Sequence, residues 1–122
     1  MIDKKKRLRS KCDRAWFEKL IKQNPLCEIC FDKAVQVHHY YPKGLYGHLR
    51  YDLDNGISLC MKCHFFHHHR GDPSIMEAVL KSRGKRWLNR LSKKAKNRPQ
   101  GSYLTISWYE QKLKELKSLS SL

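Results

Sequence analysis

The chain has 122 residues, a length that predicts one domain (residues 1–122) with a modest hydrophobic core. Lys and Arg number 26 against 11 acidic residues, which gives a formal charge of +15. This excess predicts a polyanionic partner, and we favour DNA or RNA over an anionic membrane surface, because no segment joins a wide apolar stripe to the basic runs. A basic surface that only maintains solubility is the remaining alternative.

The N-terminus is charged and has no apolar run, so the sequence predicts neither a signal peptide nor a transmembrane segment. We therefore expect a protein of a reducing, cytoplasmic compartment that does not bind membranes. In such a compartment, paired Cys-x-x-Cys motifs indicate metal ligands rather than disulfides. Four of the five cysteines are paired in this way. The fifth, Cys12, lies on a predicted helix beside Trp16 and is expected to be a buried small side chain.

The predicted elements place a compact core between helical ends. Residues 1–24 combine a basic arm with a helix from about residue 10 to residue 23. Residues 25–71 contain the predicted core, which is a short strand (34–38), a long loop (42–55), a returning strand (57–59) and a helix (61–69). The expected fold class is α+β, with a short antiparallel hairpin and a helix at its centre.

The remaining elements are helical. Residues 72–97 are predicted to form two basic helices that meet at Gly84, and residues 98–122 a linker followed by a last helix (105–119). That helix carries a narrow apolar seam, which could pack on its own domain or bind a partner. The protein is accordingly expected to be a monomer or a weak dimer.

The two cysteine pairs predict one structural zinc site. Cys27 and Cys30 precede the first strand, while Cys60 and Cys63 follow the second. Four thiolates form a closed tetrahedral site that fixes both ends of the hairpin to one ion. Because such a site has no open position, we expect it to stabilise the fold and not to catalyse a reaction.

The histidines predict a second, incomplete metal site. His64 and His68 are four residues apart and share one face of the predicted helix, whereas His67 is expected to face the zinc side with Cys63. His38 and His39 are adjacent, so both can serve one site only if the strand ends there. One of the two would then bind the metal while the other activates water.

These residues carry a family resemblance. Between about residues 25 and 70, His38-His39, Asn55 and Cys63-His64, framed by the cysteine pairs, resemble the HNH nucleases and their ββα-metal fold. The resemblance implies a zinc-stapled ββα-metal core and a DNA endonuclease.

By the same resemblance, His38 and His64 match the ligands of a catalytic divalent ion, and His68 matches a further ligand found in some members. His39 matches the general base, and Asn55 the asparagine that braces its loop. Mg²⁺ or Mn²⁺ is the ion most expected, with Zn²⁺ or Ni²⁺ as alternatives. Residues 55 and 56 could alternatively, or in addition, form an Asn-Gly turn.

A more distant resemblance concerns the phage recombination nucleases called NinG or Rap. The shared features are the start of the first helix, the segment before Asn55 and the step between the two basic helices: Lys11-Cys12-Asp13, Leu49-Arg50-Tyr51-Asp52, Arg83-Gly84 and Trp87-Leu88. This resemblance implies a phage-encoded protein in a bacterial host that nicks DNA or cuts branched DNA.

Several basic residues are candidate phosphate contacts, with a solvated surface as the alternative for each: Lys43, Arg50, Lys81, Arg83, Lys85 and Arg86. For Arg50, pairing with Asp52 and Asp54 is an equally good interpretation. Since no base-reading pattern is evident, we expect salt-sensitive binding driven by phosphates.

A non-catalytic zinc-knuckle protein that binds nucleic acid is the alternative function. It explains the charge and the cysteines, but it gives no role to His38, His39, Asn55 and His64.

Overall fold

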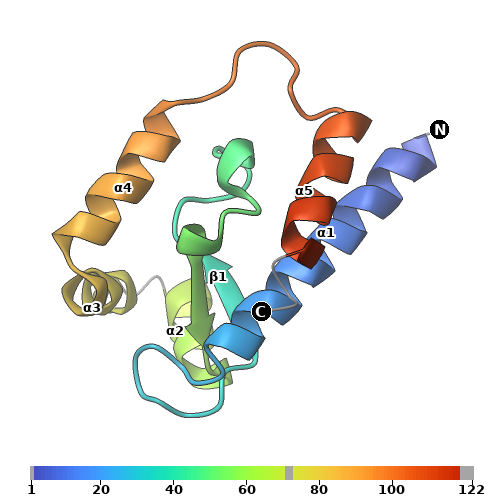
Figure 1. The fold of residues 1–122 in the computed structure, drawn as a ribbon. Coiled ribbons are helices and arrows are strands. Elements are labelled where there is room, and N and C mark those ends of the chain that lie inside the picture. The colour runs from blue at the N-terminus through green and yellow to red at the C-terminus, as the bar shows by residue number, and fades with distance from the viewer. Residues whose placement is uncertain (1, 71–72, 119–122) are drawn as a thin grey trace.

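A computed structural model describes residues 2–70 and 73–118, without the side chains of residues 2 and 68–70. The described chain is α+β, with a two-stranded antiparallel sheet among five α-helices. This confirms the predicted fold class, a short hairpin and helix with flanking helices at both ends (Figure 1).

The first helix, α1, spans Ile2–Gln23 and is longer than the sequence predicted. The Lys- and Arg-rich segment expected as an arm is helical, since both residue types have high helix propensity and Asp3 lies in the first turn, where the helix dipole favours an acid. Tertiary contacts add to this, because Leu8 packs against the same buried cluster as Cys12. The predicted end of the helix at residue 23 is confirmed.

The hairpin consists of β1, Gln36–His39, and β2, Gly56–Leu59. Both strands are displaced slightly from the predicted ranges, because the register pairs His39 with Gly56 and Gln36 with Leu59. All four residues of β2 are buried, whereas β1 is more exposed. The long connection contains two short 3-10 helices, Gly47–Leu49 and Leu53–Asn55, which the sequence did not predict.

Helix α2 spans Met61–Arg70, and α3 spans Ser74–Arg83 after Pro73. The chain turns at Gly84, whose φ of 87° favours glycine, and continues as α4, Lys85–Lys96. The last helix, α5, spans Ile106–Ser118; residue 119, its predicted end, lies outside the described residues. Within the described chain, no helix has both the length and the apolar character needed to cross a bilayer.

Two hydrophobic clusters lie on opposite sides of the hairpin (Figure 1). One joins the hairpin and α2 to α3 and α4, and includes Ile57, Val79 and Leu91. The other joins α1 to α5, and includes Trp16 and Tyr109. The apolar seam of α5 is therefore packed inside this chain, which was one of the two alternatives for it.

Gly56 sits where α1 crosses the hairpin, and this gives a stability prediction. A Cβ at Gly56 would overlap Leu20 Cδ1 and lie 2.9 Å from Trp16 Cζ2. We expect Gly56→Ala to lower the free energy of unfolding by about 1–3 kcal/mol, as overpacking does. A Cβ at Gly44 would meet no atom within 4 Å, so Gly44→Ala is the matched control. Urea denaturation measures both, and equal stability of the two variants would contradict the close approach.

Candidate active site

The four paired cysteines converge on one point. All four Sγ atoms lie within 4.8 Å of one another, with Cys30 Sγ 3.5 Å from Cys60 Sγ and 4.0 Å from Cys63 Sγ. Tetrahedral zinc with Zn–S bonds of about 2.3 Å requires sulfurs roughly 3.8 Å apart. The cluster therefore has the dimensions of a structural zinc site, as the Cys-x-x-Cys spacing predicted.

Backbone donors favour the thiolate of Cys27, whereas burial and hydrogen bonds with the neighbouring thiols raise the pKa of Cys63. Ile29 N–H donates to Cys27 Sγ and Cys63 N–H donates to Cys60 Sγ, each at 3.4 Å. Burial acts to raise the pKa of Cys27, but backbone N–H donors outweigh it and bring that pKa down to about 7. Burial raises the pKa of Cys12 to about 11 and its thiol donates to Tyr109 O at 3.3 Å, so it is a buried, inert thiol as predicted.

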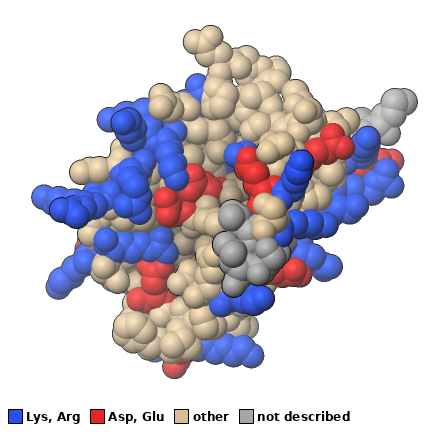
Figure 2. Space-filling model, viewed as in Figure 1, with Lys and Arg blue, Asp and Glu red and all other residues tan. Residues whose placement is uncertain are grey.

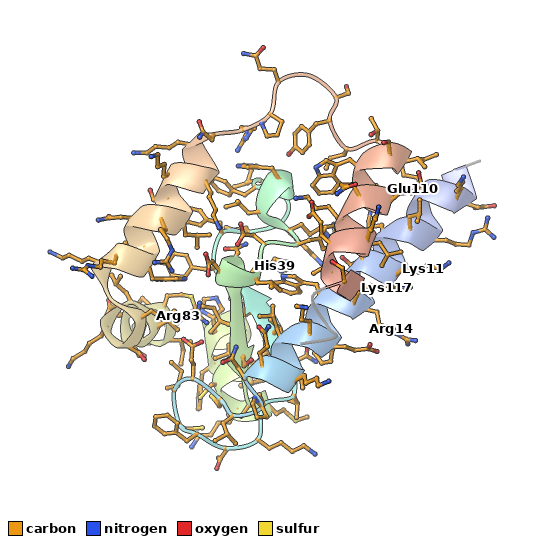
Figure 3. The ribbon with its side chains drawn as sticks, viewed as in Figure 1. Lys11, Arg14, His39, Arg83, Glu110 and Lys117 are labelled. Carbon is orange, nitrogen blue, oxygen red and sulfur yellow. The ribbon has the colours of Figure 1, made fainter. Side chains whose placement is uncertain are left out.

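Arg83 ties the cysteine cluster to α3. Its guanidinium forms a bidentate pair with Glu28, which lies between Cys27 and Cys30, and donates to Asp54 O at 3.1 Å and Gly56 O at 2.9 Å. Figure 3 shows Arg83 on the inner side of α3. The sequence suggested a phosphate contact here, and in the structure this side chain instead forms four intramolecular hydrogen bonds.

A cavity of about 600 Å³ brings the predicted histidines together. His38 and His39 line it from the end of β1, and His64 and His67 line it from α2. The strand ends at His39, which meets the condition for two adjacent histidines to serve one site. The expectation that His67 faces the zinc side is wrong, because its ring centroid lies 4.3 Å from that of His38. The side chain of His68 lies outside the described residues.

The cavity can supply imidazole ligands to a metal ion. The ring centroids of His38 and His64 are 6.5 Å apart, and those of His38 and His67 are 4.3 Å apart. Two imidazoles on one ion place their centroids roughly 5–6 Å apart, between these two values. Among the described side chains, only the cysteines converge as a set of three or more ligands, so the histidines fit an ion as a pair that leaves positions open.

His39 is held on two sides. Its Nε2 lies 2.9 Å from Arg50 O, and its ring stacks on Trp16 with centroids 4.2 Å apart and an interplanar angle of 8°. Because a carbonyl only accepts, Nε2 carries the proton and Nδ1 is the acceptor of the neutral ring. Burial lowers the pKa of His39 below its usual value, although the hydrogen bond to Arg50 O opposes this.

Asn55 braces the loop between the strands. It is fully buried, its Oδ1 accepts from Tyr41 N at 2.8 Å, and its Nδ2 donates to Tyr41 O at 3.1 Å and Leu49 O at 3.2 Å. Gly56 is extended, with φ −102° and ψ 134°, so residues 55 and 56 do not form the left-handed Asn-Gly turn that was the alternative. Asn55 thus fixes the segment that follows His39.

The other candidate DNA contacts divide into two groups. Lys43 is exposed at the cavity, and the remaining exposed residues lie on α3 and α4: Lys81, Lys85 and Arg86. Arg50 instead pairs with Asp13 on α1 through two hydrogen bonds of 2.9 and 2.8 Å, while Lys94 binds Asp52 and Asp54. Both sequence interpretations of Arg50 therefore missed its partner, which lies 37 residues away along the chain.

The sequence placed Trp16 on the first predicted helix beside Cys12, but it did not reveal the contact of Trp16 with His39. Helical periodicity identifies the buried face of α1, but it does not reveal which residue of the hairpin that face meets.

No protein-family model, curated protein or solved structure matches this chain.

Proposed function

We propose that this protein is a metal-dependent DNA endonuclease of the HNH type. The observation that carries the proposal is the convergence of His38, His39 and His64 on one cavity beside a four-cysteine cluster. The four thiolates would hold a structural ion in a closed site, and the imidazoles of the cavity would hold a second, catalytic ion with open positions.

In this proposal, His39 accepts a proton from the attacking water through Nδ1, because Nε2 is engaged with Arg50 O. Lys43, exposed at the cavity, binds a phosphate of the substrate. Asn55 holds the loop that follows His39. A divalent ion held by His38 with His64 or His67 would supply charge neutralisation at the scissile phosphate.

The residues around the cavity bear on the choice of ion. No carboxylate is among the described residues that line the cavity. Imidazole ligands bind Zn²⁺ and Ni²⁺ best, Mn²⁺ less well and Mg²⁺ least well. We therefore propose that a transition ion supports cleavage better than Mg²⁺, although the sequence favoured Mg²⁺ or Mn²⁺.

The charge of the molecule supports a DNA substrate. Figure 2 shows Lys and Arg gathered over α3 and α4 and again along α1. On α1, exposed basic residues recur at helical spacing and form one stripe: Lys4, Arg7, Lys11 and Arg14. Two basic areas on either side of the hairpin suit a duplex, which carries phosphates on both strands.

Cleavage of supercoiled plasmid tests the proposal. With Mn²⁺, Ni²⁺, Zn²⁺ or Mg²⁺, we expect nicking by the wild type and a loss of about 10²–10⁴-fold in rate for His39→Ala, the usual contribution of a general base. His48→Ala is the matched control: His48 is also half-buried, but its Nε2 binds Lys94 O and Ala95 O at the end of α4.

Folding and metal content must be equal among the three proteins for this comparison. If folded wild type bound DNA but cut neither plasmid, branched nor single-stranded DNA with any of these ions, the non-catalytic zinc-knuckle alternative would replace the nuclease.

A further inference from the structure

Helix α1 lies outside the hairpin and α2, yet it contacts the proposed base directly. The Trp16 indole covers one face of the His39 ring at a centroid distance of 4.2 Å. Trp16 is 3% exposed, and its Nε1 donates to Asp52 O at 3.0 Å. The ring plane of His39 is therefore set by a residue whose own orientation is fixed by packing and by a hydrogen bond.

The hydrogen-bond acceptor of His39 is also tied to α1. His39 Nε2 bonds to the carbonyl of Arg50, and the guanidinium of Arg50 forms a bidentate pair with Asp13. Asp13 and Trp16 are three residues apart and so lie on one face of α1. The face that covers the ring thus also anchors the residue that supplies the carbonyl.

We propose that Asp13 and Trp16 are positioning residues for His39, Trp16 by fixing the plane of the ring and Asp13 by holding Arg50 and its carbonyl in place. This inference rests on the proposed function and adds α1 to the site. A hydrogen bond from the far nitrogen of a working imidazole selects its tautomer, so the carbonyl of Arg50 determines that Nδ1 is the acceptor.

We expect the Asp13–Arg50 pair to hold the loop of Arg50 in place without contributing much to the stability of the fold. The Asp13 side chain is 42% exposed and that of Arg50 is 20% exposed. Ion pairs at such exposure contribute about 0.2–1 kcal/mol to stability, and the bidentate geometry of this pair places it toward the upper end. Its removal should therefore leave the fold intact while releasing the loop that carries the carbonyl.

The first test compares Asp13→Ala with Glu18→Gln, which removes an exposed acid from the same helix. We expect Asp13→Ala to lower kcat about 10–100-fold, as the loss of a residue that orients a working histidine does, with KM for DNA and Tm near wild type. Glu18→Gln should leave all three unchanged, and Asp13→Glu should restore part of kcat.

A double-mutant cycle separates positioning from a general structural role. If Asp13 acts through His39, Asp13→Ala has no further effect on the residual rate of His39→Ala. An equal fold-loss in both backgrounds would overturn the proposal.

The tautomer of His39 can be measured without DNA or cleavage. In ¹⁵N-histidine-labelled protein, we expect the wild type to show a single Nε2-protonated ring at His39 and Asp13→Ala to show a mixture of tautomers. An unchanged tautomer in Asp13→Ala would overturn the proposal. If the wild type cut no DNA, the proposed nuclease function would be refuted. The NMR spectrum would still show whether Asp13 determines the tautomer of His39.

Trp16 is tested by two substitutions of different character. Trp16→Phe keeps an aromatic face against His39 but loses the donor to Asp52 O, and Trp16→Leu loses both. We expect kcat to fall more for Trp16→Leu than for Trp16→Phe when folding and metal content are matched. Equal kcat values would overturn the role given to stacking.

Discussion

Chelation of the metal is expected to unfold the hairpin and α2. The four thiolates join the segment after α1 to the end of β2 and the first turn of α2, so the ion links both ends of the hairpin. Binding of zinc to such sites is worth roughly 10–16 kcal/mol, which is comparable to the whole stability of a small domain at about 5–15 kcal/mol. We expect one tightly bound equivalent of zinc per chain at the four cysteines, and loss of dispersed NMR signals from residues 56–70 when a chelator removes it.

A pair of cysteine substitutions makes this prediction specific. Cys63→Ser removes one of the four ligands and should abolish tight zinc binding and the folded core. Cys12→Ser is the matched control, because Cys12 is also buried but lies outside the cluster and donates to Tyr109 O, a bond that a hydroxyl can replace. A chelated protein that kept its core, or a Cys12→Ser variant that lost zinc, would contradict the prediction.

Substitution of Asn55 should be the most damaging change away from the metal. Asn55 itself is fully buried, and Asn55→Ala would leave three backbone groups without their hydrogen bonds, namely the part-buried N–H and carbonyl of Tyr41 and the buried carbonyl of Leu49. Each such loss costs about 1–3 kcal/mol, and because the three are not independent we expect a total of about 3–5 kcal/mol.

Urea denaturation of the zinc-loaded protein measures this effect. Asn97→Ala is the control, since Asn97 is exposed and its replacement should change the free energy of unfolding by less than about 0.5 kcal/mol. A loss below about 1 kcal/mol for Asn55→Ala would mean that the loop is held by other contacts.

The sequence predicted the hairpin and α2 because the patterns that indicate them involve residues close together in the chain. The Cys-x-x-Cys spacing, the short apolar strand segments and the helical spacing from Met61 each depend on neighbouring residues, and together they predicted the hairpin, α2 and the four-cysteine cluster. The bounds shifted by one or two residues, because the register of His39 with Gly56 is set by pairing across a 16-residue loop.

What the sequence did not reveal depends on long-range pairing. A basic residue has the same local pattern whether it meets a phosphate or a carboxylate, so Arg50 and Arg83 could not be assigned before Asp13 and Glu28 were located in space. The length of α1 was likewise hidden, because its first turns are supported by α5 from the other end of the chain.

A two-stranded sheet normally leaves both of its outer edges open to further strands. In β2, the outward carbonyl of Ser58 accepts from Glu28 N at 2.9 Å, and that of Gly56 accepts from Arg83. An incoming strand would find these acceptors already paired, by the cysteine loop and by α3. The contacts that fix the cysteine cluster to the hairpin therefore also block the addition of a further strand at this edge. Strand addition is a route by which small β-containing proteins aggregate.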